Sequence, residues 1–250
     1  MVTGAEHHVS ALQKPVRNRY FYGKHLDVRH FEMEQEYFNN KRWLLNRLVS
    51  GFGVVCGLNV VKQDGDDRNT VIVRPGLAID KWGREIIVVK DSKPVRVTPV
   101  QSGTERHEEE HIVHVCLEYL ECAADPVPVI AGECGEGQRC MPDEIHERYK
   151  LLVRPGRAPE IGRRCRIPDL TNDDTGEIDY DVLARWVSER CPPRSEESCI
   201  PLAEIRFDRH GSCEHIDITV RPVVYTNDLL YEMILAMTEP DRNASPGGKY

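Results

Sequence analysis

Residues 70–89, TVIVRPGLAIDKWGREIIVV, decide the fold class of this chain. Three short runs rich in Val and Ile are separated by two turn signals, Pro75–Gly76 and the stretch from Asp80 to Gly83. Strand-forming runs interrupted at such short intervals by Pro and Gly are typical of antiparallel hairpins. Because no helical segment separates these runs, the pattern argues against a repeated strand–helix–strand unit.

Runs of the same character occur along most of the chain, and turn residues such as the DGDDRN stretch separate them. The further runs are GFGVVCGLNVV (51–61), KPVRVTPV (93–100), HIVHVCLEYLEC (111–122), ERYKLLVRPG (147–156) and the hairpin-like PLAEIRFDRHGSCEHIDITV (201–220). Residues 122–142 and 156–176 are rich in Gly, Pro and charge, which predicts long loops. We therefore expect a mainly β (α+β) protein with a β-sandwich or barrel-like core.

Two segments have helical patterns. Asp27 is a good N-cap, and no Pro or Gly interrupts the chain from Val28 to about Val49. Phe31, Phe38 and Leu45 recur at seven-residue intervals, and Gly51 provides the C-terminal stop. The sequence therefore predicts a long N-terminal helix. A short amphipathic helix is expected within residues 178–191, and Asn227 is expected to cap a short C-terminal helix.

These elements predict four parts of the chain. Residues 1–18 form a flexible arm, and residues 19–100 contain the long helix and a first β module. Residues 101–225 form a second β module with loops rich in Cys, Pro and Gly, and residues 226–250 form the last helix and a disordered tail.

Composition excludes several classes of partner. The formal net charge is −8, whereas neutralising nucleic-acid phosphates or adsorbing to an anionic membrane needs clustered Lys and Arg. No apolar run is long enough to span a bilayer, and the N-terminus lacks the pattern of a signal peptide. We expect synthesis and folding in the cytoplasm, with neither nucleic acid binding nor membrane insertion.

The cysteines are numerous and odd in number. Nine cysteines cannot all pair within one chain, and in the absence of a signal peptide thiols or metal ligands are favoured over a disulfide framework. Two pairs in polar segments could supply a structural zinc site, although their spacings exceed that of the usual zinc knuckle. These candidate ligands are Cys134, Cys140, Cys191 and Cys199.

One motif resembles a catalytic zinc site. HEEEH, from His107 to His111, matches the H-E-x-x-H pattern, in which two His bind zinc and a Glu activates water. That chemistry requires a helix and a third ligand, for which His114 is a candidate. Here the motif leaves a charged stretch and enters β-branched residues, so a solvated acidic run is the simpler interpretation.

Other catalytic signatures are missing from the sequence. It contains no phosphate-binding G-x-x-x-x-G-K-[ST] loop, no dinucleotide-binding glycine pattern and no G-x-S-x-G nucleophile turn. We therefore expect a protein that is not an enzyme and that needs no cofactor.

Aromatic residues are concentrated beside charged residues in the N-terminal segment. Tyr and Trp are favoured in protein interfaces because they bury a large area while keeping a polar group, although packing on the chain's own β domain is the alternative. A long helix with apolar residues on more than one face has more surface than one small sheet covers. The candidate interface residues are Tyr20, Phe21, Tyr22, Leu26, Phe31, Tyr37, Phe38, Trp43, Leu45, Leu230, Met233 and Met237.

Residues 19–89 resemble a known family. The matching positions fall in three blocks, and they are Tyr20, Phe21, Gly23, Leu26, Phe31, Glu34, Gln35 and Tyr37, then Asn46, Arg47, Gly51, Gly53, Val54, Val55, Gly57 and Leu58, then Pro75, Gly76, Ala78, Asp80, Gly83 and Arg84. The blocks resemble accessory structural proteins of extracellular contractile injection systems, the phage-tail-like particles of bacteria, which are labelled baseplate or tail-fibre-like proteins. The opening block is also similar, more weakly, to the type VI secretion baseplate adaptor.

The resemblance implies a structural adaptor that self-associates, for example as a trimer. It would dock on baseplate, sheath or tube-associated proteins of the particle, and it could leave the cell as part of a released particle. Several matched residues have turn roles, because Gly and Pro permit sharp changes of chain direction; these are Gly23, Gly51, Gly53, Gly57, Pro75, Gly76 and Gly83. The alternative is a zinc-dependent protein, either a hydrolase using His107, Glu108 and His111 or a binding module held by cysteine-bound zinc.

Overall fold

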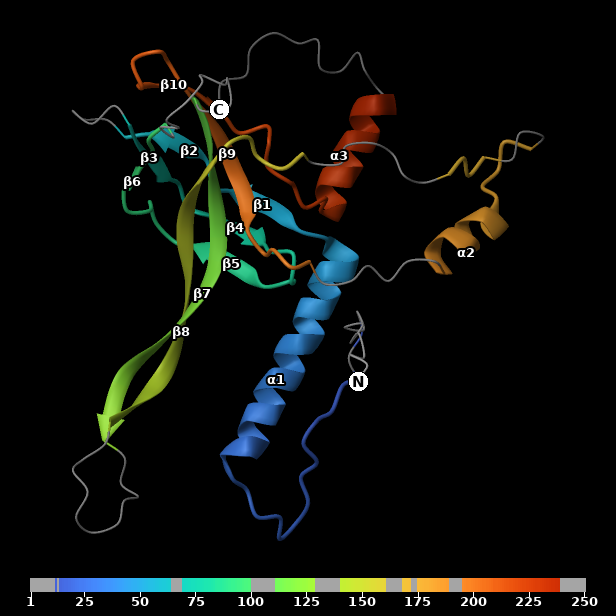
Figure 1. Cartoon of the computed structure of the whole chain (residues 1–250). Helices are drawn as coiled ribbons and strands as arrows, with labels where there is room; N and C mark the ends of the chain where they lie inside the picture. The colour runs from blue at the N-terminus through green and yellow to red at the C-terminus, as the bar shows by residue number, and fades with distance from the viewer. Residues whose placement is uncertain are drawn as a thin grey trace, which may run out of the picture.

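The structure is a computed structural model, and it describes residues 12, 14–63, 69–99, 111–128, 140–160, 168–171, 175–188 and 195–238. Within these residues the protein is mainly β, with antiparallel sheets and three α-helices (Figure 1). The expected α+β class is therefore confirmed. Three sheets form the body, and two elements, α1 and the ribbon made by β7 and β8, extend from it on the same side (Figure 1).

The first half of the chain forms two three-stranded sheets. One has the order β1 (Gly53–Gly57), β4 (Gly76–Ile79) and β5 (Glu85–Val88). The other has the order β2 (Val60–Lys62), β3 (Thr70–Val73) and β6 (Val95–Arg96). These strands coincide with the predicted β-branched runs.

The second half forms a four-stranded sheet with the order β10 (Cys213–Asp217), β9 (Ile200–Phe207), β7 (Ile112–Pro128) and β8 (Cys140–Pro155). All its strand pairs are antiparallel. The β9–β10 pair is the hairpin predicted from residues 201–220.

One hydrophobic cluster joins the three sheets. Its members include Leu58, Val73, Leu117 and Ile205, which are fully buried. Burying one such aliphatic side chain stabilises a fold by about 1.5–3 kcal/mol. Both predicted β modules contribute to this cluster, so the two halves of the chain fold against each other.

The prediction of a loop over residues 122–142 is wrong at both of its ends. β7 continues to Pro128 and β8 begins at Cys140, with Pro126 paired to Pro142 in the register. Proline weakens a strand because it lacks an N–H, but each strand of a two-stranded ribbon has a free edge that needs no donor. β7 pairs with β9 only as far as Leu117, so beyond that residue it pairs with β8 alone.

The long helix begins as predicted and ends differently. α1 spans Val28–Leu45, with Asp27 as its N-cap, and a π-helical turn over Asn46–Ser50 follows it. Gly51 then leaves the helix with a φ of 82°, which agrees with its predicted stop role.

The shorter helices are α2 (Tyr180–Ser188) and α3 (Asn227–Thr238). Asn227 is the first residue of α3 and not its cap. The hydroxyl of Thr226 instead accepts a hydrogen bond from the Leu229 amide, at 3.1 Å. Among the described residues, no helix combines the length and apolar composition that crossing a bilayer would require.

Candidate interaction surface

α1 is attached to the body mainly at its C-terminal end. The Asn46 side-chain amide donates hydrogen bonds to the Gly83 carbonyl, at 2.9 Å, and to the Glu85 carboxylate, at 2.7 Å. Arg42 forms an ion pair with the same carboxylate, at 3.0 Å. Gly83 approaches the helix so closely that a Cβ there would lie 2.0 Å from the Trp43 carbonyl oxygen. The turn between β4 and β5 is therefore the main point at which α1 contacts the β body.

That turn is held by a buried carboxylate. Asp80 is fully buried, accepts hydrogen bonds from the Trp82 and Arg84 amides, and forms an ion pair with Arg84 at 2.7 Å. The Arg84 guanidinium in turn lies between two rings, 4.3 Å from the Trp82 centroid and 4.5 Å from that of Tyr119. The PGLAIDKWGRE segment thus fixes the turn and links it to β7.

The described residues cover little of the rest of α1. No residue of the helix is buried. The preceding segment, residues 14–26, runs back beside the helix (Figure 1), where the Tyr20 hydroxyl donates to the Glu34 carboxylate. This contact raises the pKa of Tyr20, because ionising the phenol would place two negative charges together. Among the described residues, α1 is therefore half-buried along one side and exposed on the other.

The seven-residue repeat forms an exposed apolar stripe on α1. Phe31, Phe38 and Leu45 are 52%, 62% and 60% exposed. A seven-residue period is close to two helical turns, so the three side chains lie on one face of the helix. We call this face, defined by these three residues, the heptad stripe.

The other predicted interface residues also lie at the surface. The exposed ones are Tyr20, Phe21, Tyr22, Leu26, Leu230, Met233 and Met237. Tyr37 and Trp43 are half-buried. Tyr37 packs edge-on against Phe38, with ring centroids 5.4 Å apart. Periodicity and the clustering of aromatic residues therefore located apolar side chains that the described residues leave at the surface, although their role in binding another chain stays a prediction.

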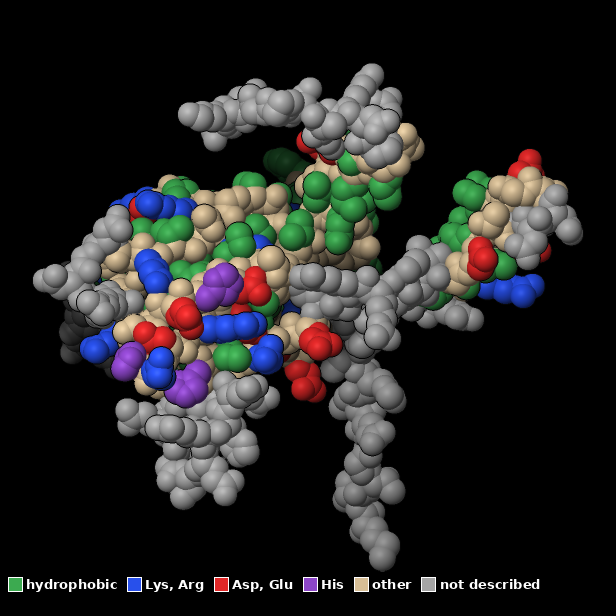
Figure 2. Space-filling model, turned by 90° about the horizontal axis from the view of Figure 1, so that it is seen from above, with side chains coloured by type: hydrophobic (Ala, Val, Ile, Leu, Met, Phe, Trp, Pro, Cys, Tyr) green, Lys and Arg blue, Asp and Glu red, His purple; other side chains and the backbone are tan. Residues whose placement is uncertain are grey.

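Two further helices present apolar side chains to solvent. α3 exposes Leu230, Tyr231, Ile234 and Met237, and α2 exposes Tyr180 and Val187. Seen from above, hydrophobic side chains remain visible on the surface, and α2 stands apart from the body (Figure 2). The helices therefore form a discontinuous apolar surface outside the β core.

Five of the predicted turn residues have a backbone conformation that favours glycine. Left-handed φ angles occur at Gly23, Gly51, Gly53, Gly57 and Gly83. At Gly57 a Cβ would lie 2.2 Å from the Pro75 carbonyl oxygen, and Gly76 starts β4 beside this contact. At these glycines the φ angle or the close approach of a neighbouring backbone favours a residue without a side chain.

The zinc-hydrolase motif does not have the required context where the structure describes it. His107 to Glu110 lie outside the described residues. His111 directly precedes β7, whereas the chemistry needs a helix to continue past the second His. His114 lies within β7, is buried, and places its Nδ1 atom 3.1 Å from the Gly156 carbonyl oxygen. His114 is therefore a buried residue of β7, and its role as a third ligand stays a prediction.

A single zinc site built from both cysteine pairs is also wrong. Cys199 forms a disulfide with Cys116, with Cα atoms 5.8 Å apart, so this pair differs from the expected free thiols or metal ligands. Cys140 pairs with Pro128 at the far end of the ribbon, about 40 Å along the strands from the register position of Cys116. Cys134 and Cys191 lie outside the described residues.

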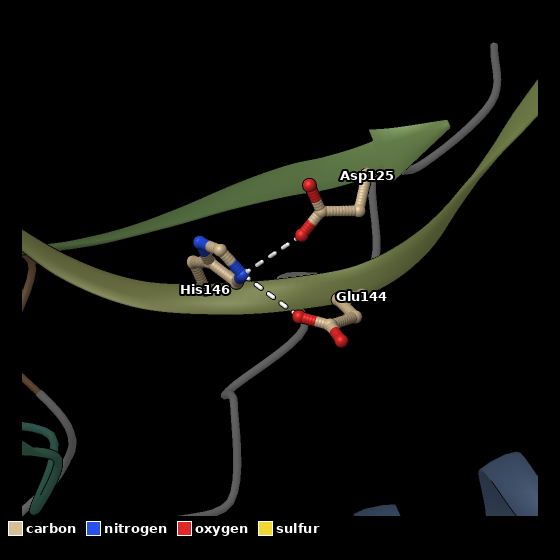
Figure 3. A group of neighbouring side chains, drawn as sticks. All are labelled: Asp125, Glu144 and His146. Carbon is tan, nitrogen blue, oxygen red and sulfur yellow. Dashed lines mark hydrogen bonds and ion pairs between the residues drawn. The ribbon is translucent and has the colours of Figure 1, made fainter. Parts of the chain in front are cut away.

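The sequence analysis missed one group of possible metal ligands. In the part of the chain that the structure describes, one such group is found, namely Asp125, Glu144 and His146 on the ribbon (Figure 3). The His146 Nε2 atom lies 3.4 Å from Asp125 Oδ2 and 2.9 Å from Glu144 Oε2. The spacing of Glu144 and His146, two apart in a strand, was the available signal, but residues up to 142 were assigned to a loop.

Together these features define a mainly β protein with an apolar helical surface outside its core. No protein family model and no curated protein sequence matches the chain. Among solved structures it is similar to "Crystal structure of TssK", with a TM-score of 0.42 and 11% identity over 95% of this chain and 51% of that chain. It is also similar to "The baseplate complex from the type VI secretion system", with a TM-score of 0.42, 12% identity and coverage of 95% and 52%. Both likenesses are distant, and the chain spans about half the length of these solved chains.

Proposed function

We propose that this protein is a structural adaptor of a contractile, phage-tail-like injection system, and that it self-associates through α1. In the proposed assembly, α1 and residues 14–26 bind further copies of the same chain. The β body acts as a sandwich- or barrel-like platform, and the assembly docks in the baseplate or tail-fibre region. The observation that carries the proposal is the exposed heptad stripe on a helix without buried residues.

A helix without buried residues gains little stability from packing in the isolated chain. Helices in proteins gain most of their stability from packing an apolar face, because propensity alone is marginal over this length. α1 has 18 residues, and its firm contacts are at one end. A partner that covers the stripe would supply the missing packing.

A second copy of the same chain is the occupant that fits the stripe best. In a coiled coil, apolar residues occupy two positions of each seven-residue repeat. Phe31, Phe38 and Leu45 supply one of these two positions, and each copy of the chain brings an identical stripe. Gln35 and Arg42, which lie between them, are polar and would favour a small bundle with a solvated rim over a dry, fully apolar seam.

The remaining exposed elements are suited to other partners. α3 and α2 expose further apolar residues, and the ribbon extends beyond the body (Figure 1). In an adaptor these elements would contact baseplate, sheath or tube-associated proteins. Catalysis forms no part of the proposal, because the sequence lacks the common catalytic signatures and several matched residues lie at turns.

The proposal can be tested on isolated particles. Particles from producing cells should contain the chain in a fixed ratio to their baseplate proteins. A Phe31→Glu/Phe38→Glu variant should fold but be lost from the particles, because charges on the stripe oppose its burial. A protein absent from wild-type particles would overturn the proposed place in an injection system, whatever its oligomeric state.

A further inference from the structure

The ribbon of β7 and β8 brings three metal-ligating side chains from two strands to one point. Asp125 comes from β7, and Glu144 and His146 come from β8 (Figure 3). One ligand atom from each of the three residues lies within 4.8 Å of the other two. We propose that these three residues form a binding site for a divalent transition ion, of which Zn²⁺ is the best match, and that the ion clips the two strands together.

The local backbone explains why the three side chains meet. Residues two apart in a strand share a face, so Glu144 and His146 point the same way. Asp125 lies between Ala124, which pairs with Glu144, and Pro126. Its φ of 52° departs from strand geometry and turns its carboxylate toward His146. Asp tolerates this left-handed conformation better than most residues.

The chemistry of the donors fits a transition ion. One imidazole nitrogen and two carboxylate oxygens are ordinary zinc ligands, and two carboxylates balance the charge of a divalent cation. Imidazole favours zinc and similar ions over calcium and magnesium, which prefer oxygen ligands throughout. His146 thus separates this group from a simple acidic cluster.

The structure assembles three ligands at this point. Cys122 is the register partner of His146 on β7, but its sulfur does not belong to the group whose ligand atoms lie within 4.8 Å of one another. Zinc sites with three protein ligands keep an open position that water can fill. Asp125, Glu144 and His146 would therefore hold the ion together with water.

Arg148 is the group that opposes binding. Its guanidinium lies 3.4 Å from the His146 Nδ1 atom, and the side chain is exposed. A bound cation would be repelled by this charge, and Nδ1 must carry the proton when Nε2 binds a metal. Arg148 would therefore turn away on binding, and removing its charge should strengthen the site.

A metal ion would stabilise the pairing of the two strands in the ribbon. Beyond Leu117 it is two-stranded, and a two-stranded hairpin is marginally stable in water. A cation that binds the paired ribbon more tightly than the separated strands stabilises the pairing by mass action. The inference does not depend on the proposed role in an injection system.

The test is a calorimetric Zn²⁺ titration of the untagged, chelator-treated protein. His146→Gln should weaken the tightest binding step at least about tenfold, because even lost second-shell partners cost 10- to 100-fold. Arg148→Gln should strengthen it. His215→Gln, at an exposed histidine of β10, should leave it unchanged.

Hydrogen exchange gives a second readout that other zinc-binding residues would not move. In the wild type, Zn²⁺ should slow amide exchange within residues 118–128 and 140–150, and in His146→Gln it should not. Zn²⁺ binding equally tight in His146→Gln, or ribbon exchange insensitive to Zn²⁺ in the wild type, would overturn the site.

Discussion

Truncating one ring of the heptad stripe should weaken self-association by a predictable amount. Phe38 is 62% exposed, which for an aromatic side chain of roughly 200 Å² leaves about 120 Å² in contact with water. At about 25 cal/mol per Å², covering all of it would contribute about 3 kcal/mol, and covering half about 1.5 kcal/mol. Phe38→Ala should thus weaken association about tenfold per chain, or about a thousandfold in the overall constant of a trimer.

Sedimentation equilibrium over a range of protein concentrations would measure this change. Glu36→Ala is the matched control, because Glu36 is exposed on the same helix but two residues away, nearly opposite Phe38. Circular dichroism should show that both variants keep the fold. Equal association constants for Phe38→Ala, Glu36→Ala and the wild type would refute the assignment of the stripe as the contact.

Three further predictions concern stability. Gly83→Ala should lower the free energy of unfolding in urea by at least about 2 kcal/mol, because its Cβ would meet the Trp43 carbonyl. The same variant should expose the end of α1 to proteases. An unchanged urea midpoint would argue against this attachment of the helix. Asp80→Ala should cost about 3–5 kcal/mol in the same assay, because it leaves the charge of Arg84 unpaired; a loss below 1 kcal/mol (about a fivefold change in the unfolding constant) would contradict it. Burial raises the pKa of the Cys213 thiol. The neutral thiol therefore stabilises the fold fully below the unfolded thiol pKa of about 8.5, and this stabilisation is lost as pH rises above that value. Cys213→Ala should flatten that alkaline decline, and an identical slope would count against the burial effect.

The strands of the first half could be predicted because their signals are local. Runs such as TVIV and REIIVV carry strand propensity, and the Asp80–Gly83 turn has the residues that its backbone requires. The turn roles of the glycines in this half could be predicted for the same reason. Local patterns could not predict that Gly83 also lies close to the backbone of Trp43, because the two residues are far apart in the sequence.

The ribbon was missed because its stability is not local. Pro126, Pro128 and Pro142 argue for a loop when each segment is considered alone. They are tolerated because each strand pairs on one side only, which depends on where β9 ends. The Cys116–Cys199 disulfide and the approach of Asp125 to Glu144 and His146 depend on strand register, so the i, i+2 spacing of Glu144 and His146 was the only part of these groups that the sequence signalled.

The interface prediction was partly accessible from local sequence, unlike the ribbon and less completely than the strands of the first half. Periodicity correctly placed Phe31, Phe38 and Leu45 on one face of a helix, but it could not decide whether their own sheet would cover them. The fold supplies that missing information, because α1 is attached at Asn46 and Arg42 and the described residues leave Phe31, Phe38 and Leu45 exposed.

The most direct test of the account is the mass of the purified protein in solution, measured by light scattering on the chromatographic peak. The account predicts a homo-oligomer, a trimer being the favoured form, which a Phe31→Glu/Phe38→Glu/Leu45→Glu variant reduces to a folded monomer. A wild-type protein that stays monomeric at every concentration, with the same mass as the variant, would contradict it.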